Sequence, residues 1–289
     1  MNLTAFAPAK VNLYLHVGGL DADGYHPLSS LMVFADVGDQ IAIQPADTPE
    51  FEITGPFGLG LDPEGDNLVM RAARAILGHI GGPVPPFRLI LDKRLPLAAG
   101  LGGGSADAGA TLRLLREVLG LPIQDEILED LAAGLGADGA ACLWGRAVIA
   151  EGRGEKLSRA PRLPELNAVL VNPGVESPTG AVYRAYDAAG APGGCERPDL
   201  PDAFEDVVEL AGWLSYCRND LEAPAVSLTP VIGEVLETLR DEPEVLLARM
   251  SGSGATCFAL CAEDIEAEGL ADRLQSMRPD WWVRRCRLG

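Results

Sequence analysis

The chain has 289 residues, of which 47% are apolar, and this length suffices for one large domain or for two smaller ones. Its 42 acidic and 23 basic side chains give a formal net charge of −19, which disfavours nucleic acid and anionic membranes as partners. A phosphate site must therefore rely on local basic residues, backbone N–H groups or a metal.

The cysteine pattern and the N-terminus bear on the cellular compartment. The six cysteines form no C-x-x-C pair and no zinc-type cluster with histidine, which predicts free thiols in a reducing compartment. No signal peptide is expected, because the first residues, MNLTAFAPAK, lack its basic and apolar segments. No apolar run reaches the roughly 18 residues of a membrane helix, so we expect a soluble cytoplasmic protein.

The first part of the chain is predicted to be rich in strands. Alternating apolar residues indicate strands in AFAPAKVNLYLHVGG, LSSLMVFADVGDQIAIQPA and FEITG. An Asp66-Asn67 cap then begins a helix over Leu68–Ile80, and FRLILDK is a short strand. Further helices are expected from near Ser105 to about Leu119 and over residues 123–135.

The second part mixes strands and helices. Strands are expected in RAVIAEG, LNAVLVNPG, VLLARM, TCFALCA and WWVRRCRL, and helices over residues 204–214, 230–240 and 265–277. Residues 188–202 are rich in Gly and Pro and predict a loop. Because strands and helices do not alternate regularly, the predicted fold class is α+β. A boundary near residues 160–166 would separate a domain of residues 1–162 from one of residues 163–289.

Three segments carry candidate chemistry. In GLGGGSADAG, the glycines around the start of a helix can expose N–H groups to an anion, although the lysine of a Walker-type P-loop is absent. Ser105 can serve a phosphate or Mg²⁺, or can be only the N-cap. MSGSGATCFAL is a second glycine turn, with a plain hairpin as its alternative. PAKVNLYLHV places Lys10 and Asn12 on one strand face, where a lone lysine usually snorkels.

In this order, PAKVNLYLHV, PLAAGLGGGSADA and MSGSGATCFAL resemble the three signature motifs of the GHMP kinase superfamily. The resemblance covers nearly the whole chain. It implies a two-domain α+β fold with the active site in the cleft between the domains, and transfer of the γ-phosphate of ATP, with Mg²⁺, to a small alcohol. DGYHPLSSLM, GLGGGSADA and LGADGAACLWGRAVIAEGRGE are typical of members that phosphorylate the 2-hydroxyl of a CDP-linked methylerythritol in the non-mevalonate isoprenoid pathway.

The resemblance also implies a catalytic pair. Asp138 matches the carboxylate that accepts or orients the hydroxyl proton, and its alternative is an N-cap. Lys10 matches the lysine that polarises the hydroxyl and stabilises the transferred phosphate. The family usually has Val-Pro after LGAD, and Gly139-Ala140 stand here instead, which predicts a looser backbone after Asp138.

The implied binding residues fall into two groups. The ATP phosphates are expected at Pro96, Leu97, Ala98, Ala99, Gly100, Leu101, Gly102, Gly103, Gly104, Ser105 and Ala106. Substrate contacts are expected from Asn12, Tyr25, His26, Thr179, Tyr183, Gly252, Ser253 and Gly254.

For Tyr25 and Tyr183 the implied role is a sandwich around cytosine, while His26 offers hydrogen bonds from its ring or backbone. The alternative for Tyr25 is a turn residue packed on the core. Lys93 and Arg94, just before Pro96, can face a phosphate or a solvated edge.

Several alternatives stay open. A GHMP kinase for another small alcohol, of mevalonate or homoserine type, needs no cytosine site. A catalytically silent nucleotide-binding protein on the same fold would be expected to lack Lys10 or Asp138. No carboxylate stands out as a Mg²⁺ ligand, and the chain can be a monomer or a homodimer.

Overall fold

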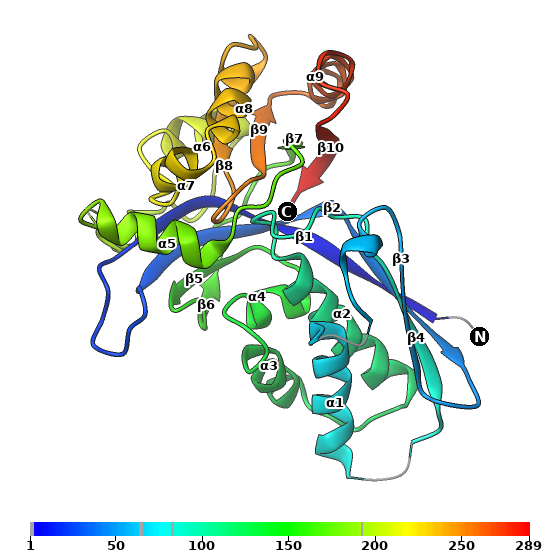
Figure 1. Cartoon of the computed structure of the whole chain (residues 1–289). Coiled ribbons are helices and arrows are strands. Elements are labelled where there is room, and N and C mark those ends of the chain that lie inside the picture. The colour runs from blue at the N-terminus through cyan, green and yellow to red at the C-terminus, as the bar shows by residue number, and fades with distance from the viewer. Residues whose placement is uncertain (1–2, 64–65, 82–83, 192) are drawn as a thin grey trace. The chain divides into compact units, whose positions relative to one another are not determined.

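The computed structural model describes residues 3–63, 66–81, 84–191 and 193–289 (Figure 1). By its internal contacts the chain divides into two compact units, each assembled from segments that are distant in sequence. Unit 1 contains Met1–Lys10, Gly38–Leu97 and Gly102–Gly145. Unit 2 contains Val11–Val37, Ala98–Leu101 and Arg146–Gly289. The expected boundary between residues 162 and 163 lies inside unit 2, and the two-domain division at that point stays a prediction.

Two long strands serve both units, because the chain changes unit within β1 (Leu3–Val17) and within β2 (Leu28–Pro45). In unit 1, the end of β2 pairs antiparallel with β4 (Phe87–Asp92), and β4 pairs parallel with β3 (Glu50–Thr54). A short 3-10 helix, Gly58–Gly60, follows β3.

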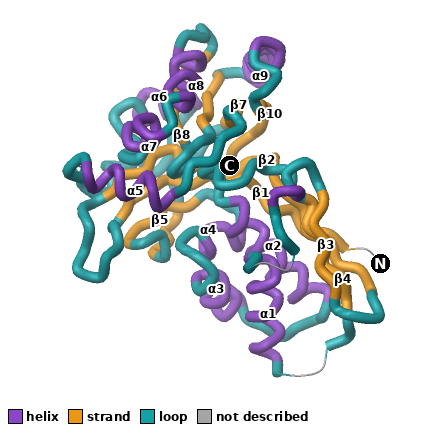
Figure 2. Tube along the Cα trace, viewed as in Figure 1, coloured by secondary structure: helices purple, strands orange, loops and turns teal. Residues whose placement is uncertain are grey.

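Among the described residues, the α-helices of unit 1 are α1 (Leu68–Ile80), α2 (Gly103–Val118), α3 (Asp125–Ala133) and α4 (Gly139–Trp144). Helix α2 is central, since it packs against α1 and α4, and α3 packs against α4; these are among the purple helices of Figure 2. Its residues from Ala106 to Leu112 are all buried, which small side chains and a glycine make possible.

Unit 2 is built on antiparallel strands. Strand β7 (Leu166–Asn172) is buried along its whole length, between β10 (Trp282–Leu288) and β9 (Cys257–Cys261). The next strand, β8 (Val245–Met250), pairs with β9. Two shorter strands, β5 (Val148–Gly152) and β6 (Lys156–Arg159), form a hairpin that pairs with the start of β2.

The helices of unit 2 are α5 (Thr179–Ala188), α6 (Val207–Leu214), α7 (Glu222–Leu228), α8 (Val231–Arg240) and α9 (Asp264–Met277). They enclose a core to which the strands contribute Val169 and Val171, and the helices contribute Tyr186, Leu236 and Leu270. Helix α9 packs against β7 and β10, and α8 packs against β8 and β9.

The α+β class and the predicted elements are confirmed, each within a few residues. The Asn67 cap is also correct, because its side chain accepts a hydrogen bond from the N–H of Val69. Residues 188–202 lack regular secondary structure beyond the end of α5, as expected, with residue 192 outside the described part. The elements α4, α5, α7 and β6 were not predicted, and three of them, α4, α7 and β6, have too few residues to show a periodicity.

The predicted free thiols are confirmed: Cys142, Cys217, Cys257, Cys261 and Cys286 are buried, and Cys195 is half-buried. Within the described ranges, no helix combines the length and the apolar character that crossing a membrane requires.

Candidate active site

Lys10 and Asp138 meet inside unit 1. The Nζ of Lys10 lies 3.2 Å from Oδ2 of Asp138, and the lysine side chain is buried while the carboxylate is 29% exposed. Asp138 occupies the N-cap position of α4, but its side chain forms no capping hydrogen bond. The N-cap alternative therefore does not explain this carboxylate, which instead forms an ion pair that keeps one side open to solvent.

Gly139, the residue after Asp138, packs closely against α3. A Cβ atom at Gly139 would lie 1.9 Å from the carbonyl oxygen of Ala132 in α3, so only glycine fits at this close approach. The N–H of Gly139 also donates to the carbonyl of Gly136 at 2.9 Å. The close packing against α3 explains the glycine at position 139, and the looser backbone expected after Asp138 stays a prediction.

The glycine loop enters α2 directly beside this pair. Gly102 is the N-cap of α2 with φ of 61°, and a Cβ atom there would lie 3.1 Å from Cε of Lys10. The helix begins at Gly103, so Ser105 lies in its first turn and the expected N-cap role of Ser105 is wrong. The N–H groups at the start of an α-helix, here those of Gly103, Gly104 and Ser105, precede the first hydrogen bond of the helix, from Ala106 to Gly102, which makes the helix start suitable for an anion.

A buried ion-pair network supports the same helix. The ammonium of Lys93 lies 2.6 Å from Asp39 and 2.6 Å from Asp107, and all three side chains are almost fully buried. Oδ1 of Asp39 accepts hydrogen bonds from the N–H groups of Arg94 and Leu95. Lys93 thus faces neither a phosphate nor a solvated edge, which corrects both expectations for this residue.

The charges in this network do not balance, because two carboxylates share one ammonium. Burial raises the pKa of Asp107 to about 7, and Asp39 adds to the rise while Lys93 opposes it. Oδ1 of Asp107 finds no hydrogen-bond partner among the described residues. A Cβ atom at Gly103 would lie 3.1 Å from the Lys93 ammonium, so the network lies directly under the first turn of α2.

A second set of predicted residues assembles inside unit 2, around the turn between β8 and β9. The hydroxyl of Ser251 donates to the carbonyl of Gly100 at 3.0 Å and accepts from the N–H of Asn12 at 3.2 Å. The Nδ2 group of Asn12 donates to Ser30 at 2.7 Å. The hydroxyls of Thr179 and Ser253 are 2.8 Å apart. Segment Ala98–Leu101, Asn12, Thr179 and this turn therefore form one hydrogen-bonded group.

The predicted cytosine residues also belong to unit 2. Tyr25 is 55% exposed, so the alternative that it packs on the core is wrong. His26 directs Nδ1 to the carbonyl of Gly18 at 2.9 Å and Nε2 to Asp187 at 3.3 Å. Its ring lies 5.1 Å from the ring of Tyr183. Both ring nitrogens of His26 are thus engaged within the protein, which leaves its backbone for a ligand.

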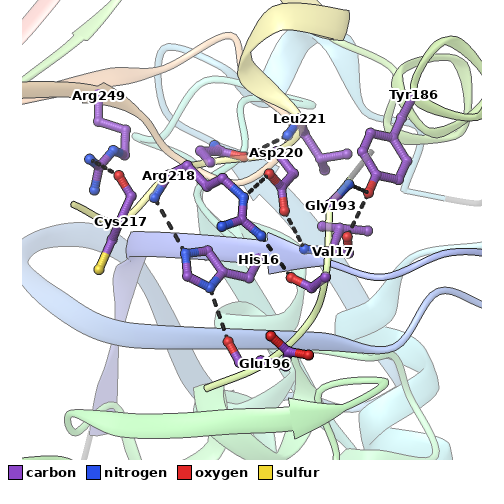
Figure 3. Close-up of polar contacts among 12 residues, drawn as sticks. His16, Val17, Tyr186, Gly193, Glu196, Cys217, Arg218, Asp220, Leu221 and Arg249 are labelled. Carbon is purple, nitrogen blue, oxygen red and sulfur yellow. Dashed lines mark hydrogen bonds and ion pairs between the residues drawn. The ribbon is translucent and has the colours of Figure 1, made fainter. Parts of the chain in front are cut away.

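Figure 3 shows a group of polar residues that the sequence did not predict. Buried His16 donates from Nδ1 to the carbonyl of Glu196 at 3.1 Å and accepts at Nε2 from the N–H of Arg218 at 3.4 Å. Burial lowers the pKa of His16, in agreement with this neutral tautomer. These contacts join segments that are distant in sequence and share no motif, so no sequence signal could have indicated them.

The same group fixes the end of β1 (Figure 3). The N–H of Val17 donates to Asp220 at 2.7 Å, and the hydroxyl of Tyr186 donates to the carbonyl of Val17 at 2.5 Å. The N–H of Gly193 in turn donates to the Tyr186 hydroxyl at 3.2 Å. The chain that leads from β1 to Tyr25 therefore starts from a fixed point.

In the parts of the chain that the structure describes, no group of three or more His, Cys, Asp or Glu residues could hold a metal ion.

Comparisons with known proteins agree with these motifs. Residues 67–146 match the family described as GHMP kinases N terminal domain, and residues 199–280 match GHMP kinases C terminal. A 4-diphosphocytidyl-2-C-methyl-D-erythritol kinase of Caulobacter vibrioides is 70% identical over 100% of both chains. One of Hyphomonas neptunium is 46% identical over 100% of this chain and 97% of its own. A crystal structure of 4-(cytidine 5'-diphospho)-2C-methyl-D-erythritol kinase has a TM-score of 0.77 and 34% identity, covering 99% of each chain.

Replacing Asp107 by Asn should change how stability depends on pH. The pKa of this carboxyl is 3.8 in the unfolded chain and about 7 in the folded chain. Between these pH values the folded state therefore holds one proton more than the unfolded state. The free energy of unfolding of the wild type should therefore fall as pH rises through this window. The free energy of unfolding of Asp107→Asn should rise, relative to that of the wild type, by on the order of 2 kcal/mol between pH 5 and pH 8.

Chemical denaturation at pH 5, 6, 7 and 8 measures this difference. Asp130→Asn, on the exposed face of α3, is the matched control, and its free energy of unfolding should change with pH as that of the wild type does. Parallel curves for Asp107→Asn and wild type would contradict the raised pKa.

Proposed function

Since the chain belongs to the GHMP kinase family, and within it to the 4-diphosphocytidyl-2-C-methyl-D-erythritol kinases, we propose that it phosphorylates the 2-hydroxyl of 4-diphosphocytidyl-2-C-methyl-D-erythritol. GHMP kinases are small-molecule kinases that use ATP as the phosphate donor. The observation that carries the proposal is the Lys10–Asp138 ion pair beside the glycine-capped start of α2. Identity of 70% over the full length of a named relative supports the choice of substrate.

In this proposal Asp138 is the general base. Its exposed carboxylate takes the proton of the 2-hydroxyl as the hydroxyl oxygen attacks the γ-phosphorus and the bond to the β-phosphate oxygen breaks. Lys10 polarises the hydroxyl and offsets charge on the transferred phosphoryl group. The ion pair with Lys10 places the Asp138 carboxylate at the site before the substrate arrives.

ATP phosphates are proposed to lie against the loop from Pro96 to Ala106. The N–H groups of the first turn of α2 supply partial positive charge without a lysine in the loop. Mg²⁺ would neutralise phosphate charge there. Ser105 and Asp138 are suitable oxygen donors, and phosphate oxygens and water would supply the remaining ligands.

The cytidine end is proposed to bind at Tyr25, His26 and Tyr183. The exposed ring of Tyr25 is suited to stacking on a base, and Tyr183 would cover the other side of that base. Because both ring nitrogens of His26 are engaged, its backbone would contact the cytosine edge. Asn12, Thr179 and the turn Gly252–Gly254 would line the alcohol end.

An ATP-consumption assay with several alcohols tests the reaction. We expect turnover with the CDP-linked methylerythritol and at most background with mevalonate, homoserine and galactose. Turnover with one of the other alcohols alone would show that the chain is a GHMP kinase of different substrate, and no turnover with any of them would favour a silent nucleotide-binding protein.

Asp138→Asn should lower kcat by about 10²-fold or more, because the amide cannot accept the hydroxyl proton. Steady-state kinetics with saturating ATP measure this loss. Asp130→Asn makes the same chemical change on exposed α3 and should leave kcat unchanged. A kcat near the wild-type value for Asp138→Asn would remove the general-base role.

Tyr25→Ala should raise KM for the CDP-linked substrate by about tenfold, because stacking on one base contributes roughly 1–3 kcal/mol. KM for ATP should stay the same. Tyr216 is 90% exposed and belongs to the same unit, so Tyr216→Ala is the matched control and should alter neither constant. A rise in KM for ATP instead would mean that the cytosine assignment is wrong.

A further inference from the structure

Arg153, in the turn between β5 and β6, lies against the exposed tyrosine of the β1–β2 loop. Its guanidinium carbon is 4.1 Å from the centroid of the Tyr25 ring. The strand register explains this placement, because Gly152 at the end of β5 is paired with Leu28 at the start of β2. The turn that carries Arg153 therefore begins next to the point where the loop of Tyr25 ends.

The loop also holds Arg153 through charge. The Nη2 group of Arg153 is 2.8 Å from Asp23 and 3.8 Å from Asp21. Asp21 in turn accepts hydrogen bonds from the N–H groups of Asp23 and Tyr25, at 3.0 Å and 2.9 Å. These backbone hydrogen bonds, that of Tyr25 first, lower the pKa of Asp21, so the carboxylate is ionised at neutral pH.

Arg153, Asp21, Asp23 and Tyr25 therefore form a closed arrangement, which we call the Arg153 clasp. The carboxylates keep the guanidinium over the ring, and Asp21 also holds the backbone of Tyr25. A guanidinium over an aromatic face restricts the rotation of both side chains. The ring remains 55% exposed, so the clasp restrains Tyr25 without burying it.

We propose that Arg153 is a positioning residue for the cytidine end of the substrate: it occupies one face of Tyr25 and thereby presents the other face to the base. This inference rests on the proposed function, in which Tyr25 stacks on cytosine. Restraining the ring in advance reduces the entropy lost when the base binds. Arg153 acts through Tyr25 and does not act as a phosphate ligand, because Asp21 and Asp23 already compensate its charge.

Two variants of Arg153 test the clasp. Arg153→Ala should weaken binding of CDP by about threefold to tenfold, measured by isothermal titration calorimetry, and should raise KM for the CDP-linked substrate by the same factor. KM for ATP and kcat should not change. Arg153→Lys keeps the charge but lacks the planar group, so its loss should be intermediate.

The matched control is Arg273, which pairs with Glu242 and Glu244 and lies over no aromatic ring of the described residues. Arg273→Ala removes an arginine between two carboxylates in the same unit and should leave CDP binding unchanged. In the Tyr25→Leu background, Arg153→Ala should have no further effect on CDP binding, because the ring through which it acts is gone.

The outcomes separate this inference from the proposed function. If wild type phosphorylates the CDP-linked alcohol but Arg153→Ala binds CDP as tightly as wild type, the clasp has no role in binding. An undiminished loss in the Tyr25→Leu background would show that Arg153 contacts the ligand itself, which also overturns the proposal. If the wild type binds no CDP and does not use the CDP-linked alcohol, the proposed function fails, and this inference fails with it.

Discussion

The buried ammonium of Lys93 holds the helix at whose start the ATP phosphates are proposed to bind. It joins Asp39 in β2 to Asp107 in α2, and Asp39 also holds the backbone that follows Lys93. Removing one of these buried charges would leave its partner uncompensated. The ion pairs therefore hold β2, α2 and the segment after β4 together. The first turn of α2 lies directly on this ammonium, and the side of Gly102 lies on the stem of Lys10. Lys93 therefore supports the loop beside the Lys10–Asp138 ion pair.

The sequence predicted the long, periodic elements and the residue types of the site, but not its supporting contacts. Helix α1 followed from its cap and spacing, and Lys10 with Asp138 followed from the family motifs. Lys93 was misjudged because nothing in DKRLP shows that two carboxylates from other elements surround it. The close approach of α3 to Gly139 was not predicted, because it is a tertiary constraint for which the local sequence has no signal.

The side chains proposed to bind substrate differ in how much of their bonding capacity is still available. His26 uses both ring nitrogens within the protein, whereas Tyr25 keeps much of its ring exposed. In unit 2, Tyr25, whose ring is exposed, is thus followed directly by His26, whose ring nitrogens are engaged within the protein. The polar contacts around His16 and Val17 hold the end of β1 and limit how far the following loop can shift.

Gly139 has a consequence for how this sequence can diverge. Its α-carbon approaches the Ala132 carbonyl so closely that any side chain requires α3 to retreat from α4. A change at this position is tolerated only together with changes along the α3–α4 contact. Because the contact is with a backbone carbonyl, no substitution at position 132 relieves it, and a chain with Val-Pro after the aspartate needs a different placement of α3.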